Sequence, residues 1–126
     1  ATHYLGLLEA QPDGTTLAAA IRNQARPAAG RGPYGAYPPG PLSREDVAGP
    51  VFAIEGADGA ALGERLPAAL AHAHRLVLHP RDAAAADLAA LRKAGWSTAA
   101  IVTLSQLVAY LAFQIRAAHG LRALAA

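Results

Sequence analysis

The chain contains no cysteine and no methionine among its 126 residues. Without thiols it cannot build a disulfide, an iron–sulfur cluster, a thiolate zinc site or a nucleophilic or peroxidatic cysteine. Position 1 is Ala1 rather than methionine, so we expect a chain that is processed, trimmed or part of a longer protein. Thiol and disulfide chemistry is therefore excluded for this chain by itself.

Charge is also scarce, and the small positive excess is spread along the sequence. The formal net charge is +2 and charged residues make up 16% of the chain, against about 25% in an average globular protein. Proteins that bind nucleic acids usually cluster their cations on one face, whereas the arginines here are scattered. We therefore expect no nucleic-acid partner.

The sequence also lacks targeting and membrane signals. Its first residues have neither the basic region nor the long apolar region of a secretory signal. The most apolar stretch, residues 99–113, is shorter than the ~18 to 20 residues of a membrane span. We expect a cytoplasmic protein without a membrane partner.

Apolar residues that recur at helical spacing predict an all-α fold in one domain. We expect a short helix within residues 3–10 and a second helix that is capped by Thr15 or Thr16 and stopped by Pro27. A third helix should begin near Asp58 and end at His79-Pro80. A fourth should be capped by Asp82, turn Leu88 and Leu91 inward and stop at Gly95, and a long fifth helix should run from Ser97 to His119-Gly120. No segment has a convincing strand pattern.

A long connection rich in proline and glycine covers residues 27–50. Connections of this length inside a compact domain are uncommon and are usually functional or linkers. Tyr34 and Tyr37 are its expected anchors onto the helices. Its Gly-x-Gly-x-x-Gly, residues 30–35, lacks the strand before it and the helix after it that a dinucleotide site requires. We divide the chain into residues 1–50, a helical segment with the Pro/Gly loop, and residues 51–126, a helical core.

Three histidines, His72, His74 and His79, are the main candidates for catalysis. Residues two apart on a helix project about 200° apart, and residues seven apart are separated by about 10 Å along its axis. Neither spacing suits a single metal ion, so we predict no metal site and no cofactor. One of these histidines can serve as a general base, and local packing or hydrogen bonding is the simpler interpretation. The sequence has no Gly-x-Ser-x-Gly motif that would indicate a serine hydrolase.

Aromatic residues and the last helix suggest two further interpretations. An apolar pocket that binds a small ligand could be lined by the following residues: Tyr34, Tyr37, Trp96 and Tyr110. The last helix is apolar on nearly all sides, which indicates either self-association or a central position with Gln106 and Gln114 hydrogen-bonded inside.

The second half of the chain carries a family resemblance. It contains, in order, Ala94-Gly95-Trp96-Ser97, Ile101, Ala109, Phe113, Arg116, Gly120 and Leu121. This order resembles the closing helix pair of the alkylhydroperoxidase D-like and carboxymuconolactone decarboxylase superfamily, and residues 2–8, 33–50 and 79–83 look like the N-terminal half of a two-part subfamily. The resemblance implies an alkylhydroperoxidase D-like helical bundle that assembles into dimers, trimers or hexamers.

In that family the activity depends on a Glu-x-x-x-Cys-x-x-Cys-x-x-x-His helix, and no position of this chain matches it. The resemblance therefore implies a non-catalytic scaffold or oligomerisation domain, with a second copy or a thiol-bearing domain or subunit as partner. The alternatives are a cysteine-independent, carboxymuconolactone decarboxylase-like enzyme with a histidine base and a small-ligand-binding module.

Overall fold

The computed structural model describes residues 2–53 and 63–126. Its elements are α1 (Thr2–Glu9), α2 (Gly14–Ala25), the 3-10 turn η1 (Pro41–Glu45), α4 (Arg65–Leu78), the 3-10 turn η2 (Pro80–Asp82), α5 (Ala85–Lys93) and α6 (Thr98–Ala125). These described residues form no strand, and one isolated antiparallel bridge joins Gly35 to Val47. The predicted all-α fold is confirmed, whereas the expected helix start at Asp58 lies outside the described residues.

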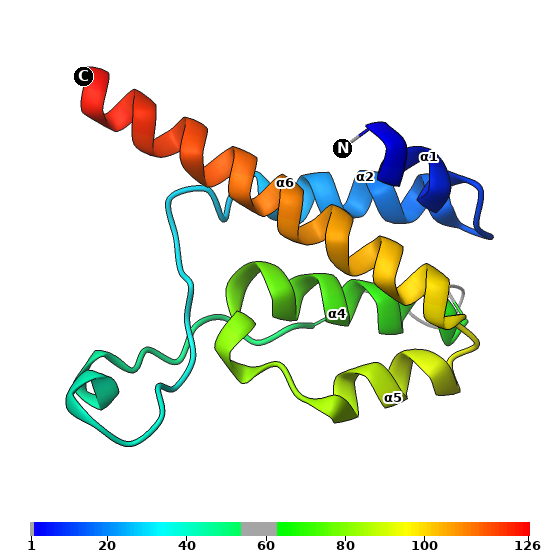
Figure 1. Ribbon diagram of the computed structural model, residues 1–126, viewed down its shortest axis with the longest axis horizontal. Coiled ribbons are helices and arrows are strands. Elements are labelled where there is room, and N and C mark those ends of the chain that lie inside the picture. The colour runs from blue at the N-terminus through cyan, green and yellow to red at the C-terminus, as the bar shows by residue number, and fades with distance from the viewer. Residues whose placement is uncertain (1, 54–62) are drawn as a thin grey trace.

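Helix α6 is the centre of the bundle and contacts α1, α2, α4 and α5 (Figure 1). Its inner face repeats apolar residues at spacings of three and four, and Ile101, Leu104 and Val108 are buried there. Leu17 and Ile21 of α2 belong to the same core, so the segments 1–50 and 51–126 share one hydrophobic interior.

Several helix ends lie where the sequence predicts them. Helix α4 ends at Leu78, next to His79-Pro80, because proline has no amide hydrogen to continue the helix. Gly95 follows α5 in the left-handed region, at φ 94°. The Ser97 hydroxyl accepts a hydrogen bond from the Ala100 amide at 3.1 Å and caps α6.

Other predicted caps are wrong. Helix α2 begins after Asp13 rather than at a threonine, and no side chain caps it. Asp82 does not cap α5, because two residues separate it from that helix and its carboxylate binds elsewhere. Asp87 instead reaches back to accept from the Ala84 amide at 2.8 Å. Leu91 is buried as predicted, whereas Leu88 is exposed.

The prediction that the last helix ends at His119-Gly120 is also wrong, because α6 continues to Ala125. A glycine inside a helix costs only about 1 kcal/mol relative to alanine, and good helix formers follow it here. By length and composition α6 could cross a membrane, and 33% of its most apolar window is buried. Length alone therefore does not distinguish a core helix from a membrane span.

The Pro/Gly loop extends away from the helices and returns to them (Figure 1). The Tyr34 amide donates to the Leu78 carbonyl at 2.7 Å, and the Arg81 guanidinium lies 3.9 Å from the centre of the Tyr37 ring. The two tyrosines thus lie where the loop meets the C-terminal end of α4 and the η2 turn that follows it. This docking brings residues 48–52, the end of the loop and the two residues that follow it, over the side of α4.

Candidate functional site

A cavity of about 530 Å³ lies between the end of the Pro/Gly loop, α4 and α5. Its lining combines apolar and ionisable side chains, which is the usual composition of small-molecule sites. The lining includes Phe52, His74, Arg75, His79, Asp82 and Asp87. The cavity brings two of the three predicted histidines into direct contact and places the third, His72, in its wall.

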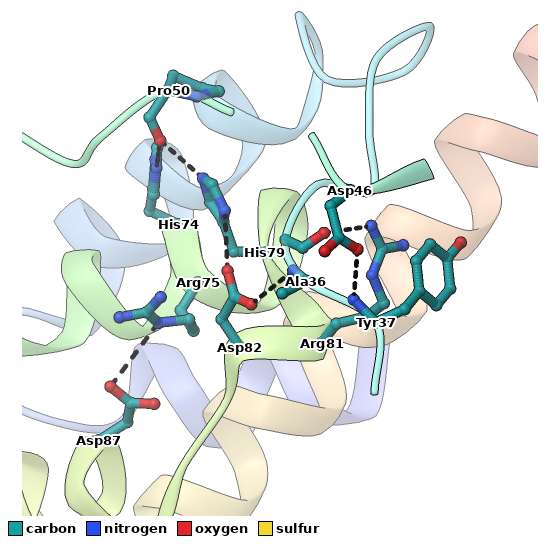
Figure 2. Close-up of polar contacts among 11 residues, drawn as sticks. Ala36, Tyr37, Asp46, Pro50, His74, Arg75, His79, Arg81, Asp82 and Asp87 are labelled. Atoms are coloured by element: carbon teal, nitrogen blue, oxygen red, sulfur yellow. Dashed lines mark hydrogen bonds and ion pairs between the residues drawn. The ribbon is translucent and has the colours of Figure 1, made fainter. Parts of the chain in front are cut away.

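His74 and His79 meet at one backbone carbonyl. Their Nε2 atoms lie 3.1 Å and 2.7 Å from the Pro50 oxygen, and their ring centres are 5.7 Å apart (Figure 2). Because a carbonyl oxygen only accepts hydrogen bonds, both Nε2 atoms must carry a hydrogen. This arrangement fixes the tautomer of a neutral His74, whose Nδ1 is left as a hydrogen-bond acceptor.

The other nitrogen of His79 faces a carboxylate. Its Nδ1 lies 3.4 Å from Oδ2 of Asp82, and Oδ1 of Asp82 accepts from the Ala36 amide at 3.2 Å. With Pro50 on one side and Asp82 on the other, both nitrogens of His79 face acceptors. The imidazolium form of His79 satisfies both, because only that form donates from each nitrogen.

Arg75 and Asp87 form the opposite side of the cavity. Arg75 Nε lies 3.8 Å from Asp87 Oδ1, which is a long, single contact rather than a two-pronged ion pair. The Arg75 side chain is 39% exposed. Its terminal nitrogens make no hydrogen bond with the residues that the structure describes, so they can reach a ligand.

His72 is buried and plays a different part from the other two histidines. Its Nε2 lies 2.8 Å from the Ser105 hydroxyl and links α4 to α6. Its Nδ1 is buried without a hydrogen-bond partner among the described residues. Burial lowers the pKa of His72 below 6.5, and the negative charge of Asp87 partly offsets that effect. Among the described residues, no carboxylate binds the His72 imidazole to orient it, as a catalytic serine–histidine pair would require. The His72–Ser105 contact therefore has the geometry of a hydrogen bond between two helices.

The four aromatic residues predicted to line a pocket are not in the lining of this cavity. The Trp96 indole donates to the Arg65 carbonyl at 2.9 Å, and Arg65 covers the ring. Tyr110 accepts from Gln114 on the surface of α6, Tyr34 lies beside His79, and Tyr37 lies under Arg81. None of the four is among the residues that line the cavity, and the aromatic ring found there is Phe52.

The sequence does not predict the contact between His74 and His79, because its apolar spacing places both residues on one helix. Residues five apart on a helix project about 140° apart. His79 instead follows the last helical residue, with φ −127° and ψ 50°, and this turn brings its ring back beside His74. The His79-Pro80 pair is the one signal in the sequence that could have indicated this, since proline disfavours helix in the residue before it.

Comparisons with protein-family models, curated proteins and solved structures found no match to this chain.

Proposed function

We propose that the protein binds a small carboxylate with an apolar body in the histidine-lined cavity. The single observation that carries this proposal is the combination, in one cavity of about 530 Å³, of the Phe52 ring with the incompletely paired guanidinium of Arg75. Pockets of roughly 300 to 1,000 Å³ hold small molecules, and a few placed polar groups orient the ligand in them. A carboxylate suits Arg75 because guanidinium and carboxylate match in shape and charge.

The same cavity also supports an enzyme in which a histidine acts as the general base on the bound molecule. The Pro50 carbonyl accepts a hydrogen bond from Nε2 of His74, so Nδ1 of His74 is the nitrogen that can take a proton from a bound molecule. Such a base requires a bound substrate first. Ligand binding is therefore the step to test before turnover.

The test is a calorimetric titration with benzoate and hexanoate, and with benzamide and hexanamide as uncharged controls. We expect the carboxylates to bind and the amides to bind at least about tenfold more weakly, because they lose the charge-assisted contact. Arg75→Gln should remove that preference. Arg92→Gln, an exposed arginine of α5 that does not line the cavity, should leave it unchanged. Equal binding of acids and amides, or equal loss in both variants, would contradict the proposal.

A second candidate is the scaffold role implied by the resemblance to the alkylhydroperoxidase D-like superfamily. It is supported by an outer stripe on α6, opposite its buried face, in which large apolar side chains are exposed. These are Val102 (48% exposed), Tyr110 (41%), Phe113 (68%), Leu121 (67%) and Leu124 (85%). The small residues Ala109, Ala117 and Gly120 lie between them. A stripe of this kind on a helix is typical of a surface that packs against another helix.

A second copy of this chain fits the outer stripe in antiparallel orientation. With a two-fold axis near Ile115, Phe113 of one copy faces Ala117 of the other, and Leu121 faces Ala109. Large side chains then meet small ones.

Analytical ultracentrifugation tests this second candidate. We expect the native chain to sediment as a dimer and Phe113→Glu to be monomeric, because the interface cannot bury an unpaired carboxylate. Leu42→Glu changes a half-exposed leucine of η1, away from α6, and should remain dimeric. A monomeric native chain, or a Phe113→Glu variant that still dimerises, would contradict the pairing.

A further inference from the structure

A second hollow, of about 480 Å³, lies between the C-terminal half of α2 and the last turns of α6. It is separate from the histidine-lined cavity and shares no lining residue with it. Its polar lining residues are Arg22, Arg26, His119 and Arg122, and the remaining ones are Ala29, Ile115 and Ala118. All the charged residues of this arginine hollow are thus positive.

The fold produces this cluster from arginines that look scattered in the sequence. Arg22 of α2 and the C-cap residue Arg26, whose backbone is still helical, are four residues apart, so they lie on the same face at the end of this helix. Arg122 comes from the far end of the chain, because α6 continues past Gly120 instead of ending there. The His119 ring packs against Gly30, where a Cβ atom would lie 2.9 Å from Nε2.

Among the described residues, these three arginines have no counter-charge. Within residues 2–53 and 63–126, none of them makes an ion pair or a side-chain hydrogen bond, and α2 and α6 contain no acidic residue. Arg65, Arg81 and Arg116, by contrast, each donate to a backbone carbonyl. Three like charges around one hollow repel one another, so an anion placed between them would be strongly attracted.

Helix-end stabilisation accounts for part of this arrangement but not for all of it. Arg22 lies in the last turn of α2 and Arg122 in the last turn of α6, where cations interact favourably with the helix dipole. That effect needs one cation at each helix end and does not need the two ends to meet. Three arginines and a histidine, brought from two helix ends, line a single hollow, and this points to a ligand with several negative charges.

We propose that the arginine hollow binds an anion that carries two adjacent phosphate groups. Guanidinium groups pair with phosphate through two parallel hydrogen bonds. A single phosphate carries about 1.5 to 2 negative charges at pH 7, so two adjacent phosphates match the three positive charges more closely than one does. Among the described residues, the lining contains no phenylalanine, tyrosine or tryptophan, and its polar side chains are arginines and one histidine. The recognised chemistry is therefore the diphosphate or bisphosphate itself, and either a soluble molecule or a phosphorylated lipid headgroup can supply it.

The first test is a calorimetric titration of the whole chain with inorganic pyrophosphate, with inorganic phosphate as the single-phosphate comparison. We expect pyrophosphate to bind at least about tenfold more tightly than phosphate. Arg22→Gln and Arg122→Gln should each weaken pyrophosphate binding roughly tenfold. Arg44→Gln, an exposed arginine of η1, should bind like the native chain. Because all three side chains are exposed, thermal unfolding by circular dichroism should shift by no more than the small helix-end contribution and would show that each variant is folded.

The second test separates the two sources of the anion by co-sedimentation with phosphatidylcholine vesicles, with and without a bisphosphorylated phosphoinositide. Pyrophosphate binding without sedimentation supports a soluble ligand. Sedimentation that needs the phosphoinositide, is lost in Arg122→Gln and is competed by pyrophosphate supports a headgroup. Failure to bind either probe, or equal weakening in Arg44→Gln, would overturn the proposal.

Discussion

At the scale of single residues, His72 shows how burial changes the chemistry of a side chain. Its imidazole is 6% exposed and links α4 to α6 through Ser105. Burial disfavours the imidazolium and lowers the pKa of His72 below 6.5. Between that lowered pKa and 6.5, the unfolded chain binds more protons than the folded chain, so the free energy of unfolding falls as the pH drops through this window.

Replacement of His72 by glutamine tests this linkage. Glutamine can keep the hydrogen bond to Ser105 but cannot titrate, so His72→Gln should lose stability less steeply than the native chain as the pH falls below 6.5. At higher pH the variant should be less stable by about 1 to 2 kcal/mol, because the side chain no longer fits its site. Urea unfolding at a series of pH values measures both effects. Parallel pH profiles for the two proteins would contradict the assignment.

At the scale of elements, the Pro/Gly loop owes its position to one close approach. Gly35 has φ 107°, a conformation that side chains with a Cβ rarely adopt. A Cβ there would lie 2.6 Å from Oδ1 of Asp82, which is the carboxylate that holds both the Ala36 amide and His79. The docked loop, the Asp82 carboxylate and the histidine pair therefore depend on one another.

The variant Gly35→Ala should displace the loop and lower the free energy of unfolding by about 1 to 3 kcal/mol. Gly6→Ala is its matched control, because Gly6 lies in α1 with nothing within 4 Å of an added Cβ. That change should stabilise the chain slightly, by about 0.5 to 1 kcal/mol, since alanine favours helix. Chemical unfolding of the two variants measures both changes. An unchanged stability in Gly35→Ala would show that the loop does not need this close contact.

The elements themselves were largely predictable because their signals are local. The apolar spacing of Ile101, Leu104 and Val108, the cap at Ser97 and the stop at Gly95 each depend on a few neighbouring residues. The errors arose where two local signals compete. Asp82 resembles a cap, but its carboxylate is used by the loop, and Gly120 resembles a stop, but good helix formers follow it.

At the scale of the whole molecule, the candidate sites could not be predicted, because they join distant parts of the chain. The Pro50 carbonyl meets His74 and His79 only after residues 27–53 have docked on α4. Arg122 reaches the arginines of α2 only through the full length of α6. Sequence spacing places residues along one helix and carries no information about which helix ends meet.

Binding of a small carboxylate in the histidine-lined cavity is tested most sharply by an NMR titration of the imidazole nitrogens with benzoate. We expect the signals of His74 and His79 to shift together and to saturate, because both rings line the cavity. His119, in the arginine hollow, serves as the internal comparison. Signals of His74 and His79 that stay unchanged, or that shift no more than the His119 signal, would contradict carboxylate binding in this cavity.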